Sequence, residues 1–376
     1  MKRIIFSVLF ALVLVVPLVA ACAEEAPAPA PKPAPTTTVT VTPTPTPSPT
    51  PEFKPVTLRY GEQGPPTGVR PEVEIWWADE VEKRTDGRVK IEFYWDQSIV
   101  KSKEMLRGVM TGAVDIALQN AAYYPSQMHT WGIFDTFVKG PKDPGVQVDV
   151  KMRCVEEIPA FTGELEQWNQ KMLIPWNYTP IALGCTYPIT KLSDMEGKKM
   201  RAASSWHMEM LEAAGATTVA LRWSECYSAL QKGTIDGVLN SVDSFYRYST
   251  DEVAKNYLWS PSLWIGHNIL TTINLDVWNS LLEQDRKIIL EISKEASDME
   301  VEKNRAFVDQ CITETTERNN AIWTEMSLED VTRWQNMPRC LAMPDKWAEE
   351  ATASGLPGEE IKNTVKAIIE EALAKE

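Results

Sequence analysis

Two stretches of the chain alternate short apolar strands with helices, and this alternation constrains the fold more than any other feature of the sequence. In the first stretch we expect strands at 56–60, 89–95 and 114–119, with helices at 71–83 and 101–111 between them. Alternating strands and helices form mainly parallel sheets that are flanked by helices. The sequence therefore predicts an α/β fold.

The second stretch repeats this plan. We expect strands at 199–202, 217–221 and 234–239, a helix capped by Ser204 or Ser205 and ended by Gly215, and a helix capped by Ser224 and ended by Gly233.

The third strands of the two stretches can be aligned. "TGAVDIALQN" (111–120) matches "KGTIDGVLNS" (232–241) and pairs Gln119 with Asn240. An internal duplication and shared turn chemistry both explain the match. Ligands bind at the carboxyl ends of strands in such sheets, so we expect Gln119 and Asn240 on the two walls of a cleft.

A helix of about 35 residues is expected between 283 and 320, where the chain has neither glycine nor proline. Apolar residues recur with helical spacing from Ile288 to Cys311. At 1.5 Å per residue this helix is roughly 50 Å long, longer than one lobe needs. We expect it to span two lobes; a coiled coil is the alternative, but the apolar stripe is too irregular for sustained heptads. A last amphipathic helix starts at 357–358.

The N-terminus has the features of a secretory signal. Lys2 and Arg3 precede an apolar segment, 4–19, that is short for a membrane span, and Val19-Ala20-Ala21 is followed by Cys22. This resembles a bacterial lipobox and predicts a lipidated Cys22, with residues 1–21 removed. An ordinary signal peptide that ends near a cysteine is the alternative. Eleven prolines and eight threonines between 23 and 55 predict an extended tether, so that 22–55 is lipid anchor and spacer.

Composition and motifs exclude several functions. The formal net charge is −14, and lysines and arginines form no stripe, which argues against nucleic acid as a partner. No nucleophile elbow, phosphate-binding loop or dinucleotide fingerprint is present. The three histidines, at 129, 207 and 267, are far apart, so we expect no metal site, no cofactor and no enzymatic activity.

Six cysteines leave five once Cys22 is acylated, an odd number in a compartment that can be oxidising. One or two disulfides are compatible with this number, and at least one thiol stays free. The favoured pair is Cys311 with Cys340.

Six motifs in order carry a family resemblance. These are "WWADEVEKRTDGRVKIEFYW" (76–95), "LRGVMTGAVDIAL" (106–118), "LSDMEGKKMRAAS" (192–204), "LEAAGATTVAL" (211–221), "CYSALQKGTIDGVLNS" (226–241) and "INLDVWNSL" (273–281). Residues 56–350 resemble the extracytoplasmic solute-binding proteins of tripartite ATP-independent periplasmic (TRAP) transporters, of the DctP type. The resemblance implies a two-lobed periplasmic-binding-protein (Venus flytrap) fold with a long helix across both lobes, and delivery of an organic anion to an ion-driven permease.

The expected organisation is therefore a signal peptide (1–21), a lipidated tether (22–55), a two-lobed binding domain (56–350) and a C-terminal helix (351–376). We expect the first lobe to hold about 56–178 with part of 265–320. The second lobe holds about 179–264 and the C-terminal helices.

The resemblance also implies two ligand-binding residues. Arg201, which ends "GKKMR", corresponds to the arginine that holds a ligand carboxylate in the family, and Asn240 corresponds to the asparagine of the family's Asp-Gly-Gln-Glu-Asn pattern. Here that pattern is "DGVLN", so valine and leucine replace its polar pair. Segments at or near strand ends supply further lining candidates, which are Gln119, Tyr123, Trp176, Trp206 and Trp223.

These observations predict an extracytoplasmic, lipid-anchored receptor that binds a small organic acid and delivers it to TRAP membrane subunits. The first alternative is a binding lipoprotein of an ATP-driven importer. The second is a surface-anchored hydrolase that uses paired carboxylates.

Overall fold

The structure of the protein is a computed structural model that describes residues 54–177, 179–266 and 268–376. The predictions for the signal peptide, for Cys22 and for nearly all of the tether fall outside the described residues. Residues from Lys54 onward belong to one compact unit.

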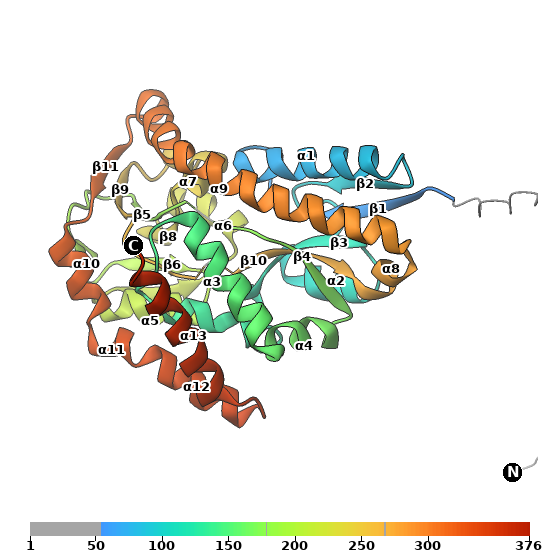
Figure 1. The fold of residues 1–376 in the computed structure, drawn as a ribbon. Coiled ribbons are helices and arrows are strands. Elements are labelled where there is room, and N and C mark those ends of the chain that lie inside the picture. Colours follow the sequence, from blue (N-terminus) through green and yellow to red (C-terminus); the bar gives the residue numbers. More distant parts are fainter. Residues whose placement is uncertain (1–53, 178, 267) are drawn as a thin grey trace, which may run out of the picture. The chain divides into compact units, whose positions relative to one another are not determined.

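Sheet A is five-stranded and contains the three strands expected in the first stretch (Figure 1). Its spatial order is β2 (Val89–Tyr94), β1 (Val56–Gly61), β3 (Ile116–Asn120), β10 (Ile269–Asn274) and β4 (Gln170–Pro175). β1 pairs in parallel with β2 and β3, whereas β10 is antiparallel to β3 and β4. β10 therefore returns to this sheet from a distant part of the sequence.

Sheet B is six-stranded and contains the strands of the second stretch. Its order is β11 (Ile322–Glu325), β9 (Asn256–Ser260), β5 (Ile181–Cys185), β8 (Gly237–Ser241), β6 (Lys199–Ala202) and β7 (Thr217–Ala220). β5 is antiparallel to both of its neighbours, and the other pairs are parallel. The chain thus passes between the sheets after β4, after β9 and once more between β10 and β11.

Helices flank both sheets, and this confirms the predicted two-lobed α/β fold. Lobe A is sheet A with α1 (Val69–Arg84), α2 (Met105–Met110), α4 (Pro159–Gln167) and α8 (Leu275–Ser280). Lobe B is sheet B with α5 (Ser205–Ala213), α6 (Trp223–Gln231) and α7 (Val242–Arg247).

The structure confirms one predicted helix cap and contradicts another. Ser204 caps α5, and its side chain accepts a hydrogen bond from the His207 N–H. Ser224 does not cap α6, because the helix begins one residue earlier. The Glu225 carboxylate accepts the Arg222 N–H at 2.9 Å and satisfies that helix start instead.

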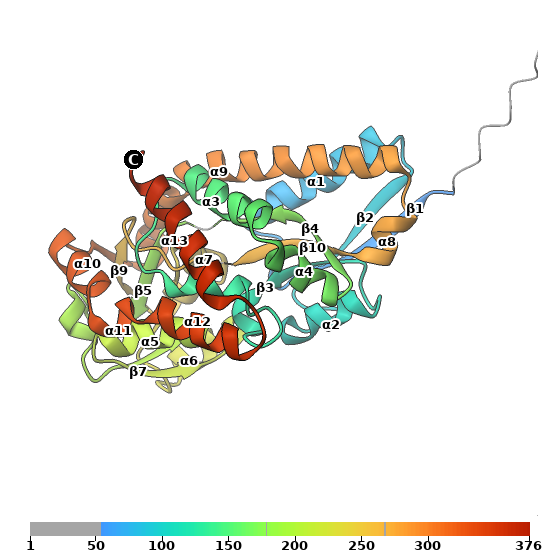
Figure 2. The same ribbon diagram turned by 60° about the horizontal axis from the view of Figure 1, so that its bottom comes forward.

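The predicted long helix is α9 (Glu283–Asn319), which has 37 residues. It lies along α1 of lobe A and also contacts α7 of lobe B, as Figures 1 and 2 show. The remaining helices are α3 (Pro144–Glu157), α10 (Leu328–Gln335), α11 (Pro338–Leu341), α12 (Met343–Ala353) and α13 (Gly358–Leu373). The C-terminal helices, expected in the second lobe, reach further: α11 packs on α5, whereas α13 packs on α3.

The predicted disulfide between Cys311 and Cys340 is wrong. The five cysteines that the structure describes are all free and buried. Cys311 packs in a hydrophobic cluster with residues of α1, α9 and sheet A, whereas Cys340 packs in a second cluster around the C-terminal helices. Because the two thiols fill separate parts of the core, each behaves as a small apolar side chain.

Candidate functional site

A small cavity lies between the two sheets and is lined from both lobes. The space open to the centre of a water-sized sphere is about 70 Å³. Lobe A contributes Gln63, Arg70, Leu118, Asn120, Ala122 and Tyr123, and lobe B contributes Arg201, Ala203, His207, Trp223, Leu239, Asn240, Ser244, Arg247 and Tyr248. Asp135, Ile265, Asn268 and Ile269 complete the lining. Four of the seven residues predicted to bind the ligand, Tyr123, Arg201, Trp223 and Asn240, meet here.

Arg201 is held rigidly in the wall of this cavity. It lies on β6, between β7 and β8, and only 1% of its surface is exposed. Its Nε donates a hydrogen bond of 2.8 Å to the Leu221 carbonyl, and its Cζ lies 5.5 Å from the ring centre of Trp223. These contacts fix the plane of the guanidinium.

The same guanidinium still has a hydrogen-bond donor without a partner among the described residues. Its Nη2 is buried and has no hydrogen-bond partner among the described residues, and no described carboxylate forms an ion pair with it. A buried cation without a counter-charge is costly. The geometry at Arg201 is therefore complementary to an anionic group in the cavity.

A hydrogen bond between Tyr123 and the backbone of Trp223 connects the lobes. Tyr123 follows directly after β3, and its hydroxyl oxygen accepts a 3.3 Å hydrogen bond from the backbone N–H of Trp223, the first residue of α6. The indole Nε1 of Trp223 is buried and has no partner among the described residues. Asn240 lies near the end of β8, where its Oδ1 accepts the Ser241 N–H at 2.9 Å.

Three of the predicted residues do not line the cavity. Gln119 is buried on the other side of β3, where its Nε2 donates to Gln170 at 3.1 Å. Trp176 is a core residue whose Nε1 donates to Thr271 at 2.7 Å, and Trp206 packs in the hydrophobic core around α5. Side chains alternate across a strand, so Leu118 and Asn120 reach the cavity and Gln119 does not.

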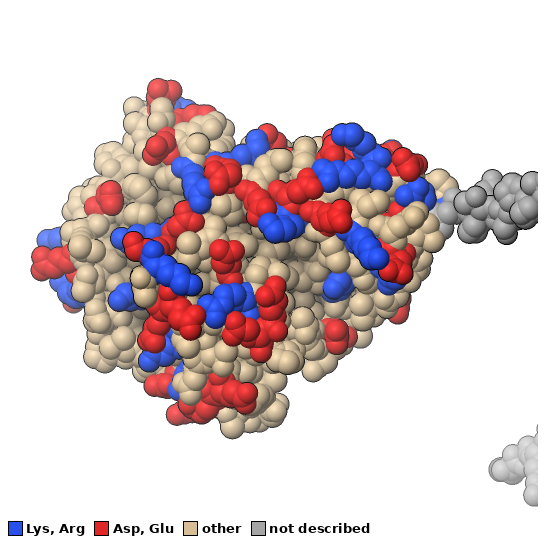
Figure 3. Space-filling model, in the orientation of Figure 1, with Lys and Arg blue, Asp and Glu red and all other residues tan. Residues whose placement is uncertain are grey.

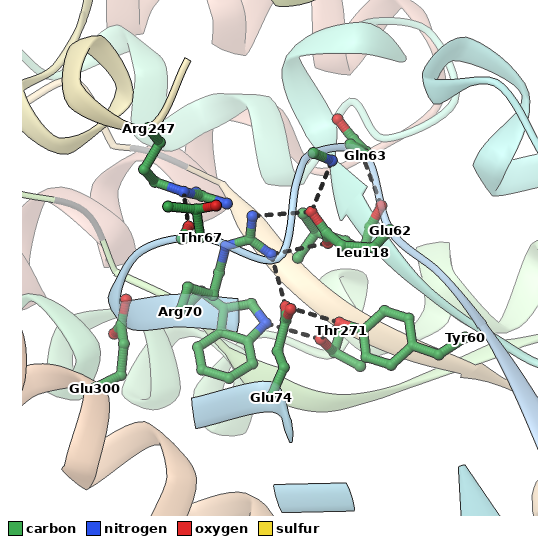
Figure 4. Close-up of polar contacts among 12 residues, drawn as sticks. Tyr60, Glu62, Gln63, Thr67, Arg70, Glu74, Leu118, Arg247, Thr271 and Glu300 are labelled. Atoms are coloured by element: carbon green, nitrogen blue, oxygen red, sulfur yellow. Dashed lines mark hydrogen bonds and ion pairs between the residues drawn. The ribbon is translucent and has the colours of Figure 1, made fainter. Parts of the chain in front are cut away.

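Sequence reasoning missed a buried charge cluster at Arg70, on the first turn of α1 (Figure 4). Its Nη1 donates to Glu62 at 2.9 Å and to Glu74 at 2.6 Å, while its Nη2 donates to the other oxygen of Glu62 at 3.1 Å. Burial raises the pKa of Glu74 to about 7. Glu62, which accepts from both terminal nitrogens of Arg70, therefore compensates its charge within the protein, and Glu74 is a second acceptor.

Arg247, at the end of α7, is the second missed arginine. It is 7% exposed, and its Nε donates to the Thr67 carbonyl of lobe A at 2.7 Å. Both missed arginines lie on the first helix after a strand, α1 after β1 and α7 after β8. The rule that ligands meet the carboxyl ends of strands could have suggested them.

Asp135, His207 and Asn268 form a polar group at the cavity. The His207 Nε2 lies 3.0 Å from the Ile265 carbonyl and 3.6 Å from Asp135 Oδ1, and Asn268 Nδ2 donates to the same carboxylate at 3.0 Å. Burial raises the pKa of Asp135. In the part of the chain that the structure describes, no group of three or more His, Cys, Asp or Glu is arranged to hold a metal ion.

A fold of two α/β lobes joined by crossing segments, with a cavity lined from both and a buried arginine in its wall, defines a two-lobed solute-binding protein. The chain belongs to the DctP family, the bacterial extracellular solute-binding proteins of family 7, whose model matches residues 74–341. Relatives in this family are substrate-binding proteins of transporters and not enzymes. No helix among the described residues is long and apolar enough to cross a membrane.

Known relatives agree with this assignment. The chain is similar to the C4-dicarboxylate-binding periplasmic protein DctP of Rhodobacter capsulatus, with 25% identity over 73% of this chain and 84% of the relative. A TRAP periplasmic solute-binding protein from Desulfovibrio salexigens, solved with orotic acid, has a TM-score of 0.76 at 20% identity and covers 84% of this chain and 99% of its own. A marine-metagenome TRAP protein specific for pyroglutamate has a TM-score of 0.72 at 17% identity, with coverage of 84% and 100%.

Proposed function

We propose that the protein is an extracytoplasmic receptor that binds a small carboxylate between its lobes and delivers it unchanged to a TRAP-type permease. The single observation that carries this proposal is Arg201, a guanidinium 1% exposed, whose Nη2 has no partner among the described residues. Arginine presents two parallel N–H donors that match a carboxylate.

Affinity for an anion has to come from this local geometry. The whole chain carries a formal charge of −14, so its overall field does not attract anions. On the face shown in Figure 3, basic and acidic side chains are interspersed and no broad basic patch is formed. A buried arginine in a water-poor cavity supplies the attraction that the surface lacks.

Release and delivery follow from the two-lobed cavity. Contacts from Trp223 to Tyr123 and from Arg247 to Thr67 cross from lobe B to lobe A. A ligand that contacts both lobes favours the closed arrangement by its difference in affinity between states. We expect only the closed form to dock productively on the permease.

Relatives support an organic acid as the ligand. Of the relatives described above, one binds C4-dicarboxylates, one was solved with orotic acid and one is specific for pyroglutamate. Each of these compounds carries a carboxyl group. In this chain the aromatic wall of Tyr123 and Trp223 suits a carboxylate attached to a compact apolar or ring-shaped body.

A lipid on Cys22 completes the proposal. Cys22 follows Val19-Ala20-Ala21, and a diacylated cysteine would keep the receptor at the membrane surface. The proline- and threonine-rich tether then leaves the binding domain free to reorient, capture its ligand and reach the permease.

A thermal-shift screen of the protein against organic acids, amino acids, sulfonates, sugars and cationic amines tests the ligand class. A ligand at a hundred times its Kd adds about 2.7 kcal/mol to the stability, which gives a clear rise in melting temperature. We expect small carboxylates to give this rise. Stabilisation by sugars or cationic amines alone would overturn the carboxylate proposal.

A further inference from the structure

We propose that Arg247 binds a second, uncharged oxygen of the ligand, so that the receptor selects carboxylic acids that also carry a carbonyl or hydroxyl group. This inference rests on the proposed function, because it takes the carboxylate at Arg201 as the first contact. It assigns to Arg247 a role in specificity that the sequence motifs do not indicate.

Arg247 is prepared for such a contact. It lines the same cavity as Arg201, its Nε is fixed by the Thr67 carbonyl, and its Cζ lies 5.6 Å from the ring centre of Tyr248. Its Nη2 is buried and has no hydrogen-bond partner among the described residues. A buried donor that stays unpaired is costly, and a ligand oxygen would satisfy it.

Charges around the cavity favour a neutral partner for Arg247. The Nη1 of Arg247 already faces the Asp243 carboxylate at 3.9 Å, and Arg70 is compensated by Glu62, with Glu74 as a second acceptor (Figure 4). Of the three arginines that line the cavity, Arg201 is therefore the one with no described carboxylate beside it. One ligand carboxylate balances that charge, and a second would enter a site whose other arginines already face carboxylates.

The loop of lobe A is shaped to receive Arg247. Gly68 has φ of 92°, and a Cβ at this position would lie 2.8 Å from the Cδ of Arg247. A Cβ on Gly64 would lie 2.1 Å from the hydroxyl of Tyr248. The side chains of α7 and of Tyr248 thus fit against this loop only because it has glycines at both places. Arg247 of lobe B thus lies against lobe A, and a ligand oxygen that it binds is held where the two lobes meet.

Calorimetric titration with matched pairs of acids tests this inference. The pairs are L-pyroglutamate with cyclopentanecarboxylate, 3-hydroxybenzoate with benzoate, L-lactate with propionate, and, as a pair with a second charge, succinate with butyrate. We expect the unsubstituted protein to bind the oxygenated monocarboxylate of at least one pair about tenfold or more tightly than its partner, as for a hydrogen bond to a charged group.

Arg247→Met should remove this preference by weakening the oxygenated acid about tenfold more than its partner, while any loss common to both acids reports the lost hydrogen bond to Thr67. Arg247→Gln keeps a neutral donor and should retain part of the preference, which keeps the test decisive should the methionine variant not fold. Arg107→Met, at an exposed arginine of α2, is the matched control for loss of positive charge and should behave as the unsubstituted protein. Arg201→Ala should weaken both members of every pair.

The other outcomes overturn either the inference alone or the inference together with the proposed function. A preference that persists in Arg247→Met, or equal weakening of both members of a pair, overturns the inference and leaves the proposed function intact. Tightest binding of succinate, dependent on Arg247, shows that the second group is charged and overturns the inference. Unchanged binding in Arg201→Ala, or no binding of any pair, overturns the proposed function together with the inference.

Discussion

Replacing Arg201 by alanine should abolish most of the ligand affinity while changing the ligand-free protein little. In a closed cavity the variant leaves the ligand carboxylate without its two N–H donors. Loss of one partner of a buried charged pair typically costs about 2 to 5 kcal/mol, which is roughly thirty- to several-thousand-fold in Kd. Arg201→Lys should recover only part of this, because an ammonium keeps the charge but loses the planar fork.

The effect of Arg201→Ala on the stability of the ligand-free protein is the sum of free-energy changes that partly cancel. Removing Arg201 leaves the Leu221 carbonyl without its 2.8 Å hydrogen bond and removes the contact with the Trp223 ring. It also removes a buried cation whose Nη2 has no partner among the described residues. Each of these terms is on the order of 1 to 3 kcal/mol, so we expect a net change of no more than about 2 kcal/mol in the free energy of unfolding.

Calorimetric titration with an acid from the screen measures the affinities, and denaturant unfolding without ligand measures the stability. Arg107→Ala is the arginine control, and Lys199→Ala is the control on the same strand; both side chains are exposed. Lys198 is not a suitable control, because it is half-buried over the Tyr187 ring. Equal, small changes in affinity across all variants would show that Arg201 does not bind the ligand. A large loss of stability in Arg201→Ala would instead indicate a structural role.

Four further perturbations have defined outcomes. Cys22→Ser should move the protein from membranes to the soluble fraction with unchanged ligand affinity, and retention on membranes after a carbonate wash would contradict the lipid anchor. Gly68→Ala should weaken the binding of an oxygenated acid by displacing Arg247. Gly87 also has positive φ, but no atom lies within 4 Å of a Cβ added there, so Gly87→Ala should lower stability only. Equal affinities of the two variants for the oxygenated acid would exclude this contact. Burial raises the pKa of Glu300 from 4.5 to about 8, so between these values the folded protein holds a proton that the unfolded chain loses. The free energy of unfolding should therefore fall as pH rises from about 5 to 8. A Glu300→Gln variant whose free energy of unfolding depends on pH with the same slope would refute this. Dithiothreitol should leave the melting temperature unchanged, since the described cysteines are free, and a clear fall would reveal a disulfide.

Local signals in the sequence determined most of the secondary structure. The absence of glycine and proline from 283 to 320 predicted α9 to within one residue of its observed end, and the strand at 199–202 is β6 as expected. Where several local signals compete, the prediction was less accurate: Ser224 is a good cap by type, but Glu225 already satisfies the start of α6. Hydrogen bonds within one turn depend on neighbouring residues alone, and for that reason they can be read from the sequence.

Sequence reasoning also brought Arg201, Asn240, Tyr123 and Trp223 to one cavity, by family motif or by position near a strand end. It chose Gln119 for the wall of the cavity, whereas the neighbouring Asn120 lines it. A displacement by one residue in a strand reverses the face on which a side chain lies, and only the packing of β3 between β1 and β10 fixes that face.

Only the tertiary structure decided which charges meet across the lobes. Arg247 and Thr67 are 180 residues apart in the sequence, and their hydrogen bond exists because α7 of lobe B packs on a glycine-containing loop of lobe A. The separation of Cys311 from Cys340 has the same origin, since each thiol fills a different part of the core. Spacing along the chain carries no information on such long-range pairs, because the approach of two distant segments is set by the shape of all the surfaces packed between them.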